Sequence, residues 1–262
     1  MNMMQMVGIM VFFFFLTLTV ICLYHEHINK KIGNLIFIIV DMIFFFGWSY
    51  AGYLQGRLND GYMTLDNISP FIMTLIPLTP LMNEKVKKCY HCAIAFLWMG
   101  MFLALSISPE HSYIFNYRHE ATFAYATETA CHMVASLYGI YLIISGQVVC
   151  DFKHLVKAAA CLYSVIGLSV AMNFIFHKSH FQMDPYGNYS IYMIDVLGSF
   201  WATLLAYLLG VLLVLIIGMQ TGYVFNKMVS KIHLEALTKS TTEKNGEGNT
   251  ENADEETATI AE

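Results

Sequence analysis

Seven apolar segments dominate the sequence, and nearly all of them are long enough to cross a lipid bilayer. A helix needs about 20 apolar residues to span the hydrocarbon core. A backbone in lipid must satisfy its own hydrogen bonds, so segments of this kind are helical. The sequence therefore predicts an all-α, polytopic membrane protein with seven transmembrane helices. The predicted spans cover residues 7–24, 32–54, 68–82, 89–107, 122–145, 155–176 and 192–219.

Composition excludes two other classes of protein. Of the 262 residues, 57% are hydrophobic and 13% are charged, whereas a soluble domain carries about 25% charged residues. The net charge of −5 comes without a basic stripe, so a nucleic-acid partner is not expected. We expect a transmembrane domain over residues 1–226 and a polar cytoplasmic tail over 227–262. The tail is predicted to be largely disordered from about residue 240, because it lacks an apolar face.

The positions of the basic residues predict the orientation. Eleven of the fourteen Lys and Arg residues follow the first, third, fifth and seventh predicted spans. Basic residues accumulate on the cytoplasmic side of membrane proteins. The N-terminus is therefore predicted outside and the C-terminus in the cytoplasm, in a multi-pass protein of the cell membrane. No basic residue precedes the first span, so we interpret it as a retained anchor rather than a cleaved signal peptide.

Polar side chains inside the spans are the candidate functional residues, because each is unfavourable in lipid. Glu128, His132 and Ser136 are spaced by four residues and therefore share one helix face. In the predicted orientation, most of the candidates fall in the outer half of the bundle. The candidate site residues are Thr74, Glu128, His132, Ser136, Asn173 and Asp195.

Each candidate also has a purely structural interpretation. A threonine such as Thr74 commonly donates to the carbonyl four residues earlier. His132 with Glu128, or Asn173 alone, could hold two helices together. Asp195 could simply mark the start of the last span near the headgroups. Asp41 lies in the middle of the second span without an evident partner, and is either protonated or bonded to another helix.

The cysteines and histidines do not predict a metal site or a cofactor. The pair Cys89 and Cys92 has the C-x-x-C spacing, but a structural zinc needs two further ligands and no second such pair occurs. Five of the six cysteines lie toward the predicted cytoplasmic side, where thiols stay reduced. We therefore predict neither a disulfide framework nor a bound metal.

Five short motifs are distinctive: Pro-Phe-Ile-Met-Thr at 70–74, Cys-His-Met at 131–133, Leu-Tyr-Gly-Ile-Tyr-Leu at 137–142, Asn-Phe at 173–174 and Asp-Val-Leu-Gly at 195–198. They resemble motifs of the YwaF-type integral membrane proteins, and the resemblance covers about residues 30–220. Animal relatives of that family are described as transmembrane phospholipid acyltransferases, and more distant ones as androgen-induced transmembrane hydrolases of lipid esters.

The resemblance implies roles for three of the candidate residues. The proposed nucleophilic cysteine of the acyltransferase branch falls on Thr74, the family histidine on His132 and the family asparagine on Asn173. This chain departs from the motif, since Ile72 replaces a histidine and a threonine replaces the cysteine. The hydrolase branch is described with a Thr and His pair. The implied substrate is a membrane phospholipid or a fatty-acyl ester.

The residues themselves allow such chemistry. A threonine hydroxyl is a weak nucleophile that needs an adjacent base, and His132 could accept its proton. Glu128 could orient the imidazole, as the third member of a triad does, and Asn173 or Ser136 could stabilise an oxyanion. The sequence thus predicts acyl transfer or lipid-ester hydrolysis.

Three alternatives remain open at this stage. A transporter or channel could use Asp41, Glu128 and Asp195, although the internal repeats common in transporters are not evident. A non-catalytic membrane scaffold is the second alternative. A seven-span zinc hydrolase ranks lower, because only His132 lies well within a predicted span.

Overall fold

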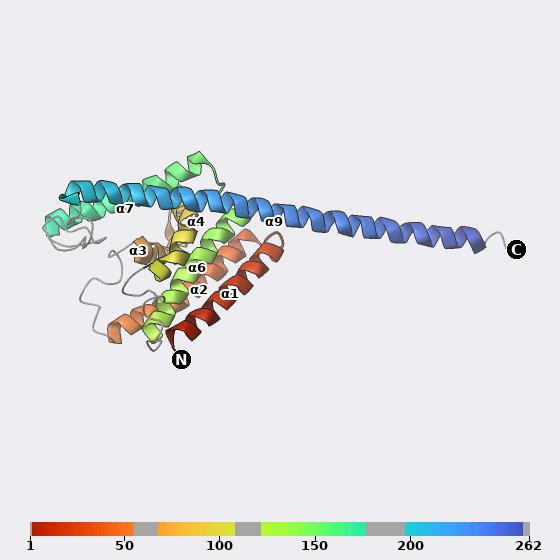
Figure 1. Ribbon diagram of the computed structural model, residues 1–262, viewed down its shortest axis with the longest axis horizontal. Helices are drawn as coiled ribbons and strands as arrows, with labels where there is room; N and C mark the ends of the chain where they lie inside the picture. Colours follow the sequence, from red (N-terminus) through yellow and green to blue (C-terminus); the bar gives the residue numbers. More distant parts are fainter. Residues whose placement is uncertain (1, 55–67, 108–121, 177–196, 259–262) are drawn as a thin grey trace. The chain divides into compact units, whose positions relative to one another are not determined.

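The protein is described by a computed structural model that covers residues 2–54, 68–107, 122–176 and 197–258 (Figure 1). Within these ranges, side chains are described except at residues 3, 104–107 and 233–258. The chain divides into two units, Met1–Tyr223 and Val224–Glu262. The helices are α1 (Met3–Tyr24), α2 (Lys30–Leu54), α3 (Ile68–Leu75), the 3₁₀ turn η2 (Thr79–Leu81), α4 (Glu84–Ile107), α6 (Phe123–Ile144), α7 (Phe152–Phe176) and α9 (Phe200–Ala258).

Helix α6 forms the centre of the first unit. It packs against α1, α2, α3 and α4, and Figure 1 shows α1 and α2 running alongside it. Every residue from Thr129 to Ile144 is buried. Thr122 caps the helix through its hydroxyl, which accepts a hydrogen bond from the backbone N–H of Tyr125. The core of the first unit is therefore built around a helix that carries several polar side chains.

Glycines allow the inner helices to approach closely. A Cβ atom at Gly139 of α6 would lie 2.6 Å from the carbonyl oxygen of Ile94 on α4. At Gly218 of α9, an added Cβ would collide with the carbonyl of Phe96, also on α4. Trp98 of α4 donates its indole N–H to the carbonyl of Gly218 over 3.2 Å. The absence of side chains at these two positions thus fixes how near α6 and α9 lie to α4.

The outer helices expose large apolar side chains. Phe12 and Phe13 of α1, Phe46 of α2 and Leu168 of α7 each expose well over half of their surface. Among the described residues, four segments are long and apolar enough to cross a membrane, namely Met4–Tyr24, Lys30–Leu54, Phe152–Phe176 and Phe200–Ile232. Apolar surface on this scale suits contact with lipid rather than water, and indicates a membrane protein.

The third predicted span is not one continuous helix. Helix α3 has eight residues and so rises only about 12 Å, well short of the roughly 30 Å of a bilayer core. Pro77 and Pro80 explain the break, because a proline cannot donate the intrahelical hydrogen bond and its ring crowds the preceding turn. The chain continues through turns into η2. The number of membrane crossings and the orientation of the termini stay predictions.

The other predicted spans correspond to helices with similar bounds. The predicted ends at residues 24, 54, 107 and 176 coincide with the ends of α1, α2, α4 and α7. The last helix differs most, because α9 begins at Phe200 and continues as helix through Ala258, across the stretch whose composition predicts disorder. The connections that follow the second, fourth and sixth predicted spans, 55–67, 108–121 and 177–191, lie outside the described residues.

Candidate functional site

Thr74 lies in the last turn of α3 and is half-buried. Its hydroxyl donates a hydrogen bond of 2.7 Å to the carbonyl oxygen of Pro70, four residues earlier. This is the local bond that threonines commonly form within a helix. A nucleophilic Thr74 would therefore have to rotate its hydroxyl proton away from this carbonyl.

His132 is buried in α6, with 4% of its surface exposed. Its Nδ1 atom lies 2.9 Å from the backbone carbonyl oxygen of Glu128. A carbonyl can only accept, so Nδ1 carries the proton, and in the neutral ring Nε2 is the nitrogen that is able to accept one. The sequence predicts that the Glu128 side chain orients this ring. The partner of Nδ1 is the backbone carbonyl oxygen of the same residue, because in a helix this oxygen lies close to a side chain four positions later. The role of the Glu128 side chain stays a prediction.

Helices α3 and α6 pack against each other, so Thr74 and His132 lie on neighbouring elements. The supporting residues are spread more widely. Ser136 of α6 donates its hydroxyl to the carbonyl of Trp98 on α4 over 2.7 Å, and thereby helps to join these two helices. Asn173 is completely buried on α7, which packs against α4. Asp195 lies outside the described residues.

Asp41 of α2 is fully enclosed by protein, with 0% of its surface exposed. Neither carboxylate oxygen has a hydrogen-bond partner among the described residues. Tyr90 of α4 and Cys131 of α6 lie close enough to interact with this carboxylate electrostatically. The Tyr90 hydroxyl nevertheless donates elsewhere, to the carbonyl of Ile72 over 2.6 Å. Within the part of the chain that the structure describes, Asp41 is thus a buried acid without a hydrogen-bond partner.

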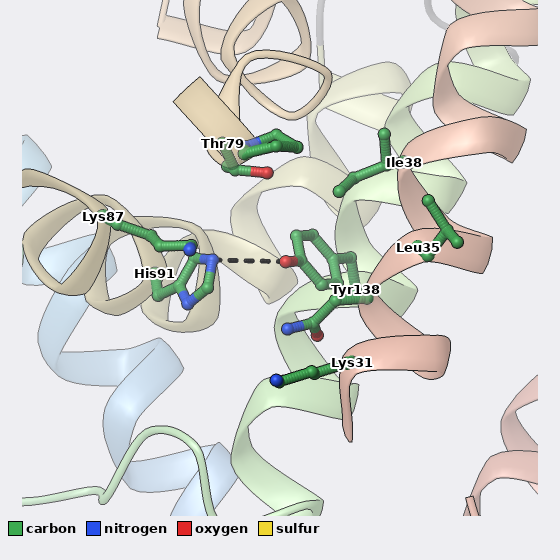
Figure 2. Close-up of a pocket in the computed structure, with 9 residues that line it drawn as sticks. Lys31, Leu35, Ile38, Thr79, Lys87, His91 and Tyr138 are labelled. Carbon is green, nitrogen blue, oxygen red and sulfur yellow. Dashed lines mark hydrogen bonds between the residues drawn. The ribbon is translucent and has the colours of Figure 1, made fainter. Parts of the chain in front are cut away.

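A pocket of about 290 Å³ opens between α2, η2, α4 and α6, and we call it the lysine pocket (Figure 2). Figure 2 shows Lys87 and His91 of α4 on one side, Lys31 and Leu35 of α2 on another, and Tyr138 of α6 between them. Its nine lining residues are Lys31, Asn34, Leu35, Ile38, Thr79, Pro80, Lys87, His91 and Tyr138. Charged groups line the pocket together with apolar ones, so an amphipathic ligand would find partners for both of its parts.

Several polar groups of the lysine pocket are already engaged. The Tyr138 hydroxyl and Nε2 of His91 share a hydrogen bond of 3.2 Å, and the Thr79 hydroxyl donates to the carbonyl of Ile76 over 2.7 Å. The Asn34 amide pairs with the amide of Gln147 from the α6–α7 connection, with Nδ2 of Asn34 donating over 2.9 Å. The two lysine ammonium groups therefore supply most of the hydrogen-bond donors that a ligand could use.

The sequence does not predict this pocket. In the sequence, Lys31 and Lys87 are two of the basic residues that predict the membrane orientation, and His91 lies between Cys89 and Cys92. One signal is present in the sequence, since Lys87 and His91 are spaced by four residues and so share a face of α4. The meeting of that face with Lys31 depends on helix rotations that a single sequence does not specify.

None of the cysteines in the described segments forms a disulfide, and Cys92 is buried. Within those same segments, no three His, Cys, Asp or Glu side chains gather closely enough to hold a metal ion.

Comparisons with models of protein families, with curated proteins and with solved structures find no match for this chain.

Proposed function

We propose that the chain is a membrane enzyme that transfers or hydrolyses the acyl group of a lipid ester, with Thr74 as nucleophile and His132 as general base. The observation that carries this proposal is the hydrogen bond from Nδ1 of His132 to the Glu128 carbonyl. It leaves Nε2 as the proton acceptor, which is the tautomer a general base needs. The packing of α3 against α6 supports the pairing of the two residues.

The first step forms an acyl-enzyme. The Thr74 hydroxyl leaves the Pro70 carbonyl, Nε2 of His132 takes its proton, and Oγ1 attacks the ester carbonyl carbon. The carbonyl π electrons move onto oxygen, and the amide of Asn173 is the candidate donor to that oxyanion. When the tetrahedral species collapses, the C–O bond to the alcohol breaks, and the alcohol leaves with the proton from His132.

The second step releases the acyl group. Water or an acceptor hydroxyl gives its proton to Nε2 of His132 and attacks the acyl-threonine carbonyl. Collapse of this second intermediate returns the proton to Thr74 Oγ1. Water as the acceptor gives hydrolysis, and a lipid hydroxyl gives acyl transfer. A membrane phospholipid or a fatty-acyl ester, entering sideways between the apolar outer helices, is the proposed substrate, as the resemblance to YwaF-type proteins also implies.

The test uses the full chain in lipid nanodiscs that contain a phospholipid with an isotope-labelled acyl chain, and mass spectrometry follows transfer or release of the label. We expect Thr74→Ala and His132→Ala each to reduce turnover to background. Thr127→Ala is the matched control, because the Thr127 hydroxyl makes the same kind of bond to the carbonyl four residues earlier, at 2.9 Å from Phe123. Turnover that survives in folded Thr74→Ala protein would refute the proposed nucleophile.

Asp41 favours a second candidate function, proton- or cation-coupled transport. An acid that is buried without a hydrogen-bond partner among the described residues is costly inside a membrane helix, and such residues often carry ions. Asp41→Asn in proteoliposomes would then abolish pH-driven uptake while leaving acyl turnover unchanged. An unaltered flux in this variant, measured with a pH-sensitive dye, would remove the support for transport.

A further inference from the structure

We propose that the lysine pocket binds the phosphate group of an anionic lipid. This binding site is separate from the Thr74 and His132 pair, so the inference does not depend on the acyl-transfer proposal. Three observations carry it: the two lysines that converge on the pocket, the absence of an acidic residue among its nine lining residues, and the apolar surface beside it.

The charges of the pocket favour an anion. Lys31 reaches the pocket from α2 and Lys87 reaches it from α4. The lining therefore carries two positive charges, and an anion bound in the pocket would attract both of them. The acid paired with Lys87 is Glu84, whose carboxylate lies 3.2 Å from the ammonium but is 75% exposed. An exposed pair of this kind contributes little, and an ammonium has three N–H donors. Lys87 can therefore bind a phosphate while still contacting Glu84.

The apolar surroundings favour a lipid over free phosphate. Leu35 lines the pocket and exposes 52% of its surface, and Ile32, Ile36 and Ile39 on the same helix are similarly exposed. A phosphate held by the lysines would thus leave its acyl chains beside an apolar surface of α2. The pocket also lies at the end of the bundle that is predicted to be cytoplasmic, where membranes carry most of their anionic lipid and where basic pockets between helices bind phosphate headgroups.

The experiment titrates purified full-length protein in an uncharged maltoside detergent, at fixed ionic strength, with dioctanoyl phosphatidic acid, and reads binding from the thermal midpoint. Two further arms use inorganic phosphate and dioctanoylglycerol, which lack the acyl chains and the phosphate, respectively. The pocket variant is Lys31→Gln with Lys87→Gln. The matched control is Lys30→Gln with Lys88→Gln, which removes the same charge from the same two helices outside the lining of the pocket. Lys31→Gln alone, at an exposed residue, serves if the double variant does not fold.

We expect the pocket variant to raise the half-saturating concentration of phosphatidic acid at least tenfold, and the control pair to raise it less than threefold. Dioctanoylglycerol is expected to bind at least tenfold more weakly than phosphatidic acid to the unmodified protein. Equal effects of the two double variants would overturn the proposal, because they would indicate diffuse attraction to a basic surface. Binding of inorganic phosphate as tight as that of the lipid, with the same variant dependence, would overturn the assignment to a lipid.

Discussion

Replacing Gly139 by alanine tests the central packing of the bundle. Gly139 lies on α6, where its Cα faces α4. The added methyl group would meet the backbone carbonyl oxygen of Ile94 at 2.6 Å and the Cβ atom of Trp98 at 3.0 Å, whereas an ordinary contact begins near 3.4 Å. Backbone atoms cannot rotate out of the way, so α4 and α6 would have to separate.

The size of the effect follows from two opposing contributions. Overpacking in a well-packed core destabilises by about 1–3 kcal/mol, while replacing glycine by alanine inside a helix stabilises by about 0.5–1 kcal/mol. We therefore expect a net loss of about 1–2 kcal/mol, which corresponds to a fall in the thermal midpoint of roughly 2–8 °C for a chain of this size.

The matched control is Gly167→Ala on α7, where an added Cβ would have no atom within 4 Å. That variant gains the helix propensity without the collision, and should raise the midpoint by roughly 1–4 °C. Both variants are compared with the unmodified protein in the same detergent, by following the folded fraction on a size-exclusion column after heating. A Gly139→Ala midpoint equal to or above that of Gly167→Ala would refute the close approach of α4 and α6.

Two further predictions concern acidic residues. Asp41→Asn keeps the shape of the side chain and removes a buried carboxylate that has no partner among the described residues. The thermal midpoint should therefore stay unchanged or rise. A decrease of more than about 2 kcal/mol in the free energy of unfolding would instead reveal a hydrogen-bond partner. Asp151, which precedes α7, accepts hydrogen bonds from the backbone N–H of His154 at 2.8 Å and from its ring Nδ1 at 2.7 Å, and these bonds hold the pKa of Asp151 below its ordinary value of 3.8. The resulting stabilisation is fully present above about pH 4 and is lost as the pH falls through the lowered pKa. The difference in thermal midpoint between the unmodified protein and Asp151→Asn should therefore be smaller at pH 3 than at pH 5. A difference that does not change with pH would contradict this assignment.

Helix positions were largely predictable from the sequence, because long apolar runs end where charged or turn-forming residues begin. The predicted ends at residues 24 and 54 match those of α1 and α2, and in each case the apolar run itself stops there. The structure of the segment around Pro77 was harder to predict, because its apolar composition favours one continuous span whereas its prolines favour a break in the helix. The hydrogen-bonding chemistry of proline determines the outcome there, and hydropathy does not detect it.

The candidate sites were predictable only as a set of residues. The spacing of Glu128, His132 and Ser136 correctly indicates one face of a helix, but not which atoms of that face bond to each other. The Nδ1 bond goes to a backbone carbonyl, and Ser136 bonds to α4. Such choices depend on rotamers and on the distance to the neighbouring helix. The lysine pocket depends even more on tertiary structure, because its lining comes from three helices and η2.

Several polar residues with candidate functions lie on helices that carry a weak membrane signal, namely Glu128, His132 and Ser136 on α6 and Lys87 and His91 on α4. Helices α4 and α6 are not among the four described segments that meet the criteria of length and apolarity for a span, yet α6 is the most enclosed helix described. The neighbouring helices shield α6 from lipid, and this explains both facts. Helices that face lipid must be apolar. An inner helix can carry His132, Ser136 and Tyr138 as long as their polar atoms find partners inside the protein. In such a bundle a site for a lipid need not lie on the most hydrophobic helices. A lipid site is expected where a ligand can reach an inner polar helix between apolar outer helices. The lysine pocket is such a place, because Tyr138 of the inner helix α6 and the exposed Leu35 of α2 both line it.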